Sequence, residues 1–361
     1  MITSTASLAE LSDSILSRYE LEHSLNLDFG GCRIMVKSNN SNLNHNLKAY
    51  YRSFLCDQND YDILINAVYS QSPGINLDFS VKQPDPGKTR IKEEFVDLRD
   101  GRVVRKRLTG MVFLFGGSIN LAIGLCDLNV NQVVNFINNR FIQWLLNRGC
   151  LLCHAAAVAD GKHGMAIAGF SGMGKSTLAL HLMSHNLRFV SNDRLMIRRE
   201  NSELLMYGVA KHPRVNPGTI LNNETLFPVI SGAERRRLVS LTSEELWDLE
   251  QKHDVIIEDV FGKDRFDLDS PLNTFVVLNW RLGGGPADVH TVDIDKRRDL
   301  LPAIMKSPGL FYEPDGDPND YDFSETAYIE LLKEIRIVEI TGGVDFDHAT
   351  RKCLDYLKSD S

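Results

Sequence analysis

The chain has 361 residues, of which 43% are hydrophobic and 24% are charged. This composition excludes a fibrous or disordered class, and the length predicts two domains, because single hydrophobic cores stop growing beyond about 250 residues. The formal net charge of −8 argues against broad binding to nucleic acid or anionic membranes, which depends on Lys and Arg side chains.

No apolar stretch approaches the roughly 20 residues that cross a bilayer, and the first residues do not resemble a secretory signal. We therefore expect a cytoplasmic protein without nucleic-acid or membrane partners. Its six cysteines are expected to stay reduced.

Short extended segments separated by turn residues fill the chain between residues 25 and 126. Turn clusters such as the one at residues 84–87 bound these segments, as is typical of strands. The pattern predicts a strand-rich α+β domain over residues 1–125, with one helix at 42–55. The predicted strands cover residues 25–28, 32–36, 61–68, 75–81, 103–107 and 111–115.

A second domain is expected over residues 126–361, beginning with a helix at 131–148 where apolar residues recur at helical spacing. Apolar segments at 151–159 and 165–168 predict a tight strand pair. Strands and helices then alternate, which predicts an α/β fold. Helices are predicted at 175–185, 243–252 and 346–358, and strands at 188–191, 195–198, 276–280, 289–294 and 335–341.

Residues 169–176 read Gly-Phe-Ser-Gly-Met-Gly-Lys-Ser and match the phosphate-loop pattern G-x-x-x-x-G-K-[ST] at every fixed position. Glycines let the backbone turn its N–H groups toward phosphate oxygens, and the helix that follows presents its positive end to the same anion. Lys175 would reach the β- and γ-phosphates of ATP, and the Ser176 hydroxyl would ligate Mg²⁺. The predicted cradle comprises Gly169, Ser171, Gly172, Met173, Gly174, Lys175, Ser176 and Thr177.

The residues around this loop resemble the HPr kinase/phosphorylase family and its HprK-related kinase branch. As in that family, a histidine, His154, lies 21 residues before Lys175, and residues 187–197 follow the loop helix with the sequence Leu-Arg-Phe-Val-Ser-Asn-Asp-Arg-Leu-Met-Ile. Residues 207–218 resemble the HprK-related branch. The resemblance implies a catalytic domain with the fold of the HPr kinase C-terminal domain and PEP carboxykinase, with ATP and Mg²⁺ as cofactors. Whether the protein forms a homo-oligomer is left open.

Elementary chemistry gives the neighbouring polar residues plausible roles. An Asp at a strand end beside the loop can hold Mg²⁺ or accept the proton of an attacking hydroxyl, and Asp193 is the candidate for both. His154 can orient that carboxylate or move a proton. Lys211 and Arg214 lie in an extended, proline-containing stretch that can present cations to developing phosphate charge.

Asn192 departs from the family pattern. The resemblance places at this position an Asp that acts as base in the kinase direction and as acid in phosphorolysis. An amide cannot take up a proton. We therefore expect Asp193 or His154 to carry proton transfer and the reverse reaction to be weak.

The predicted function is transfer of the γ-phosphoryl group of ATP to a hydroxyl, on a protein serine or on a small metabolite such as an amino acid or hydroxy acid. The region after residue 221 does not resemble the carrier-docking helices of the family, so both acceptor classes stay open. An alternative from another class is a nucleotide-dependent switch or slow NTPase without an acceptor.

Three further features receive weaker interpretations. Arg281 is another candidate cation, and Lys263 with Arg265 could form a mobile substrate loop. Residues 150–154 match the C-x-x-C-H signature for haem attachment. Because the segment is apolar, we expect Cys153 to pack in the core instead.

Overall fold

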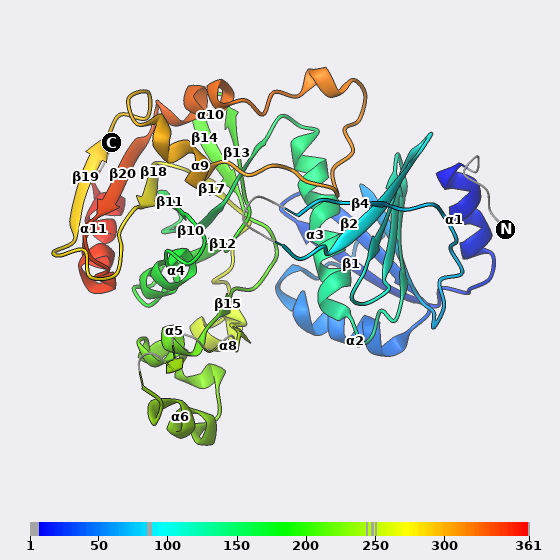
Figure 1. Ribbon diagram of the computed structural model, residues 1–361, viewed down its shortest axis with the longest axis horizontal. Helices are drawn as coiled ribbons and strands as arrows, with labels where there is room; N and C mark the ends of the chain where they lie inside the picture. Colours follow the sequence, from blue (N-terminus) through cyan, green and yellow to red (C-terminus); the bar gives the residue numbers. More distant parts are fainter. Residues whose placement is uncertain (1–6, 85–88, 243–244, 247–248, 250, 360–361) are drawn as a thin grey trace. The chain divides into compact units, whose positions relative to one another are not determined.

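The computed structural model describes residues 7–84, 89–242, 245–246, 249 and 251–359. The chain forms two compact units: unit 1 contains Met1–Asn147 and Pro308–Asp320, and unit 2 contains Arg148–Ser307 and Tyr321–Ser361 (Figure 1). The units divide after Asn147 and not at residue 125, because helix α3 (Val130–Leu146) packs within unit 1. Its Phe136 ring lies 4.9 Å from that of Phe113 in the N-terminal sheet.

Unit 1 is built on an eight-stranded sheet with the order β1-β2-β3-β8-β7-β6-β5-β4. Its pairs are antiparallel except for β2–β3 and β3–β8, which are parallel. The strands are β1 (His23–Phe29), β2 (Cys32–Ser38), β3 (Ile63–Tyr69), β4 (Ser80–Val81), β5 (Glu93–Leu98), β6 (Gly101–Lys106), β7 (Val112–Gly116) and β8 (Ile119–Gly124). The helices are α1 (Leu8–Leu16), α2 (Ser41–Tyr50), the short 3₁₀ turn η1 (Arg52–Phe54) and α3.

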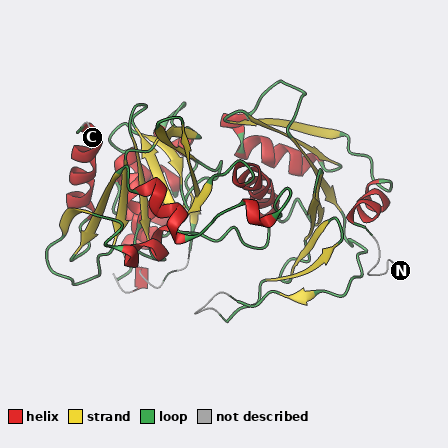
Figure 2. Cartoon of the chain, turned by 90° about the horizontal axis from the view of Figure 1, so that it is seen from above, coloured by secondary structure: helices red, strands yellow, loops and turns green. Residues whose placement is uncertain are grey.

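Helices cover both faces of this sheet (Figure 2). Because successive side chains of a strand point to opposite faces, a strand covered on both sides is apolar throughout. On β7, Val112 and Leu114 join the cluster under α1, whereas Phe113 and Phe115 contact Phe136 of α3. This explains why every residue of β7 is buried.

Several predictions for this region need correction. The strand predicted at 75–81 is confined to Ser80–Val81, and the helix predicted at 42–55 ends at Tyr50 before η1. Strands β5 and β8 and helix α1 were not predicted. Strand β5 carries charged residues that interrupt its apolar pattern, whereas α1 has a local signal, a capping box formed by Ser7 and Glu10, that the prediction missed.

Unit 2 contains a six-stranded sheet with the order β12-β10-β11-β18-β20-β19, a four-stranded sheet with the order β17-β14-β13-β9, and the pair β15–β16. Its strands are β9 (Leu151–Cys153), β10 (Ala155–Ala159), β11 (Gly164–Gly169), β12 (Arg188–Ser191), β13 (Leu195–Glu200), β14 (Glu203–Tyr207), β15 (Arg214–Val215), β16 (His253–Asp254), β17 (Asp269–Pro271), β18 (Thr274–Leu278), β19 (Asp288–Val292) and β20 (Arg336–Thr341).

The helices of unit 2 include α4 (Lys175–Met183), which follows β11, and α11 (Phe346–Lys358), which packs against α4. A smaller group, formed by α5 (Pro217–Leu221), α6 (Gly232–Val239) and α8 (Ile257–Phe261), lies together below the sheet in Figure 1. The remaining helical elements are η2 (Glu224–Val229), η3 (Arg298–Leu300), α9 (Leu301–Ile304), η4 (Pro318–Asp320) and α10 (Glu325–Leu332), with η4 in unit 1. Most of the helix predicted at 243–252 lies outside the described residues.

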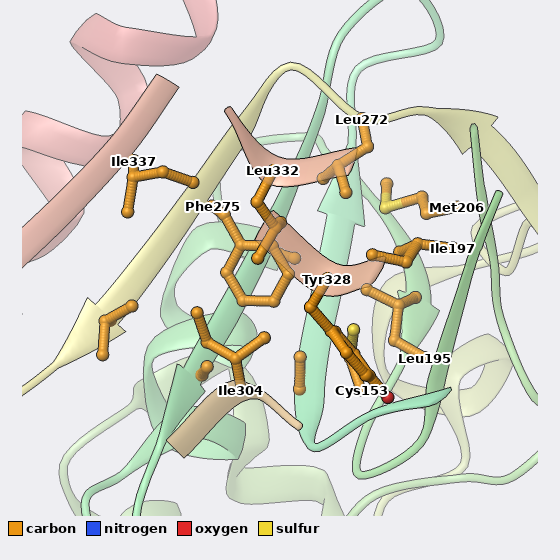
Figure 3. Close-up of a cluster of buried hydrophobic side chains, with 14 of the residues drawn as sticks. Cys153, Leu195, Ile197, Met206, Leu272, Phe275, Ile304, Tyr328, Leu332 and Ile337 are labelled. Carbon is orange, nitrogen blue, oxygen red and sulfur yellow. The ribbon is translucent and has the colours of Figure 1, made fainter. Parts of the chain in front are cut away.

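The core of unit 2 fills the space between the two larger sheets and helices α9 and α10. Figure 3 shows Phe275 of β18 and Tyr328 of α10 among aliphatic side chains, with Cys153 beside them. The Tyr328 hydroxyl donates to the Leu152 carbonyl, which satisfies the polar end of a buried ring. The expectation that Cys153 packs in the core is confirmed, and its burial raises the pKa of its thiol.

No helix within the described ranges is long and apolar enough to cross a membrane.

Candidate functional site

Three segments of the candidate site meet at one edge of the six-stranded sheet. The predicted strand pair is confirmed: β10 runs antiparallel to β11, with Ala155 opposite Ala168, and it also runs antiparallel to β12, with Ala157 opposite Ser191. The start of β10 therefore lies beside the ends of β11 and β12. For that reason His154, which precedes β10, shares an edge with the glycine-rich loop after β11 and with Asn192-Asp193 after β12.

The glycine-rich loop has the strand–loop–helix context predicted from the sequence. Gly172 and Gly174 have φ angles of 86° and 88°, a left-handed region that side-chain-bearing residues rarely adopt. Gly174 is the N-cap of α4, so the helix begins at Lys175 and its N-terminal N–H groups face the loop. The Lys175 Nζ donates to the Gly169 and Phe170 carbonyls at 2.8 and 3.3 Å. Burial lowers the pKa of Lys175 to about 8, against the opposing effect of the Asp193 charge.

Two aromatic residues from later segments brace this loop. The indole of Trp280, which follows β18, donates through Nε1–H to the Met173 carbonyl at 2.9 Å. The ring of Phe346, at the start of α11, packs edge-on against Trp280 with centroids 5.0 Å apart. A Cβ at Gly174 would lie 2.6 Å from the Phe346 ring, so only glycine fits there.

His154, Asp193 and Lys306 form a charged cluster at the sheet edge. His154 Nε2 lies 3.1 Å from Asp193 Oδ1, and Lys306 Nζ lies 3.5 Å from Asp193 Oδ2. Burial alone would raise the pKa of Asp193, but the hydrogen bond from His154 and the charge of Lys306 outweigh it and hold the pKa below its usual value. Asp193 is therefore a stable carboxylate that can orient a cation or an imidazole.

Lys306 was missed by sequence reasoning. No sequence motif contains Lys306, and backbone hydrogen bonds bring it to the site. The His154 N–H donates to the Ile304 carbonyl at 2.7 Å, and the Lys306 N–H donates to the Leu152 carbonyl at 3.0 Å. These bonds place the segment after α9 beside the turn that carries His154. The contact is long-range, and no local pattern could have revealed it.

A pocket of about 390 Å³ brings most of the predicted residues together. Gly169 and Met173 are not among its lining residues; their carbonyls accept hydrogen bonds from Lys175 and Trp280. The pocket is lined by the predicted residues His154, Ser171, Gly172, Gly174, Lys175, Ser176, Thr177, Asp193, Lys211 and Arg214, and also by Asn192, His212, Val215, Asn216, Thr219 and Lys252.

Two of the basic side chains that line the pocket, Lys211 and Arg214, differ in their surroundings. Lys211 is half-buried, and burial together with nearby Arg194 lowers its pKa. Arg214 is exposed and forms an ion pair with Asp254 at 3.0 Å. Of the lining side chains, four are Lys or Arg and one is an acid, Asp193. The pocket therefore favours an anionic occupant.

The donor set fits phosphates and a divalent cation. The pocket combines N–H groups at a helix start with a hydroxyl at Ser176 and a carboxylate at Asp193, which are oxygen donors of the kind that Mg²⁺ takes. The Asn192 Oδ1 is buried and meets no hydrogen-bond donor within the part of the chain that the structure describes. In that same part, no group of three or more His, Cys, Asp or Glu side chains could hold a metal alone.

Two weaker candidates have other surroundings. Arg281 and Lys263 are not among the pocket-lining residues, and Arg281 continues the sheet by donating from its backbone to the Gly342 carbonyl. Arg265 bonds the Leu187 carbonyl and the Asn186 side chain, which fixes the turn between α4 and β12. These bonds argue for a structural role of Arg265, and its assignment to a mobile substrate loop stays a prediction.

The fold is a mixed α/β architecture with several sheets, and its site gathers a glycine-rich loop, a histidine and a carboxylate. No family model matches the chain. It is similar to the HPr kinase/phosphorylase of Geobacillus kaustophilus, with 25% identity over 177 residues that cover 47% of this chain and 56% of that protein. It is also similar to the HPr kinase/phosphorylase of Listeria welshimeri, with 32% identity over 119 residues that cover 32% of this chain and 38% of that protein.

These similarities confirm the predicted resemblance to the HPr kinase/phosphorylase family. The chain spans about half or less of the length of these relatives. Among solved structures, the HPr(Ser) kinase/phosphatase of Coxiella burnetii matches with a TM-score of 0.30 and 14% identity, covering 57% of this chain and 89% of that chain. A structural likeness of that size carries no weight for fold or function.

Proposed function

We propose that unit 2 is an ATP- and Mg²⁺-dependent kinase domain that transfers the γ-phosphoryl group to a hydroxyl. The observation that carries the proposal is the convergence of Lys175 with the His154–Asp193 pair in one basic pocket. The curated relatives are named HPr kinase/phosphorylase, which supports a phosphoryl-transfer role. On this proposal, unit 2 is the phosphate-loop domain, of the HPr kinase C-terminal and PEP carboxykinase type, and unit 1 is an accessory domain.

The loop and its surroundings would hold the donor. Backbone N–H groups of the loop and the start of α4 would bind phosphate oxygens, and Lys175 would turn from the Gly169 carbonyl toward the β- and γ-phosphates. Ser176 and Asp193 would hold Mg²⁺, which neutralises charge on the phosphates when it is bound. Lys211 and Arg214, which line the same pocket, would stabilise charge that develops during transfer.

Proton transfer falls to His154 or Asp193. As the acceptor oxygen bonds to the γ-phosphorus, the bond to the ADP oxygen breaks and the hydroxyl proton must leave. Asn192 has no basic group to receive it. Asp193 already accepts from His154 and Lys306, so it is also suited to orient the imidazole. An experiment can distinguish the two side chains by asking which of them the chemical step requires once the nucleotide is bound.

The acceptor can be a protein serine or a small hydroxylated metabolite. The excess of Lys and Arg in the pocket wall offers charge to an acceptor that is itself anionic, such as an amino acid or hydroxy acid carboxylate. A serine in an acidic peptide would also be attracted by these Lys and Arg side chains. The labelling experiment below separates these classes.

Incubation of the protein with γ-labelled ATP and a cell lysate, divided afterwards into protein and small-molecule fractions, tests the function. Label in either fraction supports a kinase and identifies the acceptor class. Label found only as inorganic phosphate would contradict it and favour a slow NTPase or a nucleotide-dependent switch. Failure to bind ATP at all would reject both.

Variants then test the residue roles. Asp193→Asn and His154→Gln should each retain ATP binding and lose transfer, with the larger loss of single-turnover rate at the residue that takes the proton. His163→Gln is a matched control, because His163 lies at the other end of the β10–β11 hairpin. Equal transfer by all three variants would refute both assignments.

A further inference from the structure

A second pocket, of about 420 Å³, lies entirely within unit 1. Its size suits a small molecule. The floor is aromatic, formed by Phe113, Phe136 and Phe311, whose centroids lie 4.9 to 6.3 Å apart. The rest of the wall is cationic and amide-bearing, and is lined by Arg90, Ile91, Lys92, Lys106, Arg107, Leu108, Asn131, Gln132, Asn135 and Asn139. No acidic side chain lines it among the described residues.

The charges on the β5–β6 hairpin change pattern at this pocket. Where charged residues face each other along the β5–β6 ladder, their charges are opposite and they form ion pairs. These pairs are Asp97 with Arg102, Glu94 with Arg105, and Glu93 with Lys106. Opposite charges stabilise such cross-strand pairs, and like charges destabilise them.

The next pair along the ladder, Lys92 and Arg107, has like charges instead of opposite ones. The Arg107 N–H donates to the Lys92 carbonyl at 3.1 Å, so two exposed cations lie side by side where the hairpin reaches the pocket. Arg90 adds a third cation to the same wall. Because no acidic side chain among the described residues lines this pocket, an anion bound there would offset the repulsion.

The helical wall supplies hydrogen-bonding groups. Asn131, Asn135 and Asn139 recur at every fourth position of α3 and therefore lie on one face of the helix. Beside them, the Gln132 Oε1 is a buried acceptor that meets no donor within the described ranges. Rotation of the Gln132 side chain, which lines the pocket, would turn this acceptor toward a hydroxyl or amino group on a ligand.

We propose that this pocket binds a small anion that also carries hydroxyl or amino groups, either a phosphate ester or a carboxylate. Lys92 and Arg107 bind the anionic group, Gln132 accepts from a ligand donor, and the aromatic floor contacts the carbon skeleton. The site is distinct from the phosphate loop, since all of its lining residues belong to unit 1.

Hydrogen exchange with local resolution tests the proposal, because it separates the two units. The probes are glycerol 3-phosphate and glycerate, with glycerol as the uncharged comparison and inorganic phosphate as the anion without hydroxyls on carbon. The readout is the exchange of the Arg107 and Gly110 amides, which donate to the Lys92 and Lys106 carbonyls, and of the first turns of α3. At one hundred times its Kd, an effective probe slows exchange through local opening by about 100-fold.

Binding of the same anions to the phosphate loop is read separately from peptides covering residues 169–178. Protection by the phosphate ester alone identifies a phosphate site, and protection by glycerate alone identifies a carboxylate site; either result supports the proposal. The absence of protection at the hairpin and α3 with both anions would overturn it. Equal protection by glycerol, or by inorganic phosphate, would overturn the assigned ligand class.

Three variants make the test specific. Lys92→Glu creates an opposite-charge pair with Arg107, so it is expected to fold and to lose the protection. Arg99→Glu, in the turn at the other end of the same hairpin, is the matched control and should retain it. Gln132→Leu should weaken protection by glycerol 3-phosphate and leave any weak effect of inorganic phosphate unchanged. Full protection in Lys92→Glu would refute the site.

Discussion

The Nε1–H of Trp280 donates a hydrogen bond to the Met173 carbonyl at 2.9 Å, and so joins the end of β18 to the glycine-rich loop. We predict that Trp280→Phe weakens ATP binding by about two- to tenfold, because one buried hydrogen bond contributes about 0.5–1.5 kcal/mol and its loss leaves the Met173 carbonyl without its indole donor. Calorimetric titration with ATP measures the effect. Trp144→Phe, in α3 of unit 1, is the control and should bind ATP normally. Unchanged affinity in Trp280→Phe would show that the loop keeps its shape without this bond.

Lys306 is expected to support phosphoryl transfer through Asp193. Removing its ammonium in Lys306→Ala should reduce the single-turnover rate by about 100-fold, the scale found when one positioned charge is lost from an active site. Lys306→Arg should restore part of the rate, since it keeps the positive charge. Lys162→Ala, in the exposed turn between β10 and β11, is the control. A loss of ATP binding in Lys306→Ala, with transfer otherwise normal, would indicate a binding role instead.

Asn192→Asp is expected to strengthen the reverse reaction. A carboxyl at this position could donate a proton to the alkoxide oxygen that leaves phosphorus, which then becomes the acceptor's hydroxyl; the amide cannot do this. The measurement is the release of label from the phosphorylated acceptor on addition of inorganic phosphate, compared between wild type and variant. Efficient release by the wild-type protein would contradict the expectation that Asn192 limits phosphorolysis.

Asp100 ties helix α1 to the β5–β6 turn. Its carboxylate accepts from the Leu8 and Ala9 N–H groups at 2.6 and 3.2 Å, at the helix N-terminus. Asp100→Ala should destabilise α1 by about 1 kcal/mol, which speeds local amide exchange by about fivefold. Asp13→Ala, exposed on the same helix, is the control and should leave the exchange unchanged.

The same contact predicts a pH dependence. Slight burial acts to raise the pKa of Asp100, but the hydrogen bonds from Leu8 and Ala9 outweigh it and hold the pKa below its ordinary value. A carboxylate with a lowered pKa in the folded state stabilises that state above its unfolded pKa. The difference between wild type and Asp100→Ala should therefore be constant at neutral pH and shrink as the pH falls below 3.8 through the folded pKa. A difference that grows in acid would refute the role.

Local pattern predicted some elements well and failed where strands depend on their partners. Helix α11 was predicted with the observed bounds, because apolar residues at helical spacing face the core from Phe346 onward. Strand β5 was missed because Glu93 and Glu94 interrupt its apolar alternation; it forms through its backbone ladder with β6, along which Glu93 and Glu94 pair with Lys106 and Arg105. At residues 75–79 the alternation is real, but Ile75, Leu77 and Phe79 pack against the cluster under α1 without forming a ladder.

The amino-acid order alone was enough to predict the glycine-rich loop, its flanking strand and helix, and the candidate roles of His154 and Asp193. These features depend on residue type and short spacing, since a tight backbone turn requires glycine and an anion requires nearby N–H groups. Lys306, the Trp280 brace and the pocket in unit 1 could emerge only from the folded chain. Each arises where segments distant in sequence meet through strand pairing or helix packing, and such contacts leave no local pattern to read.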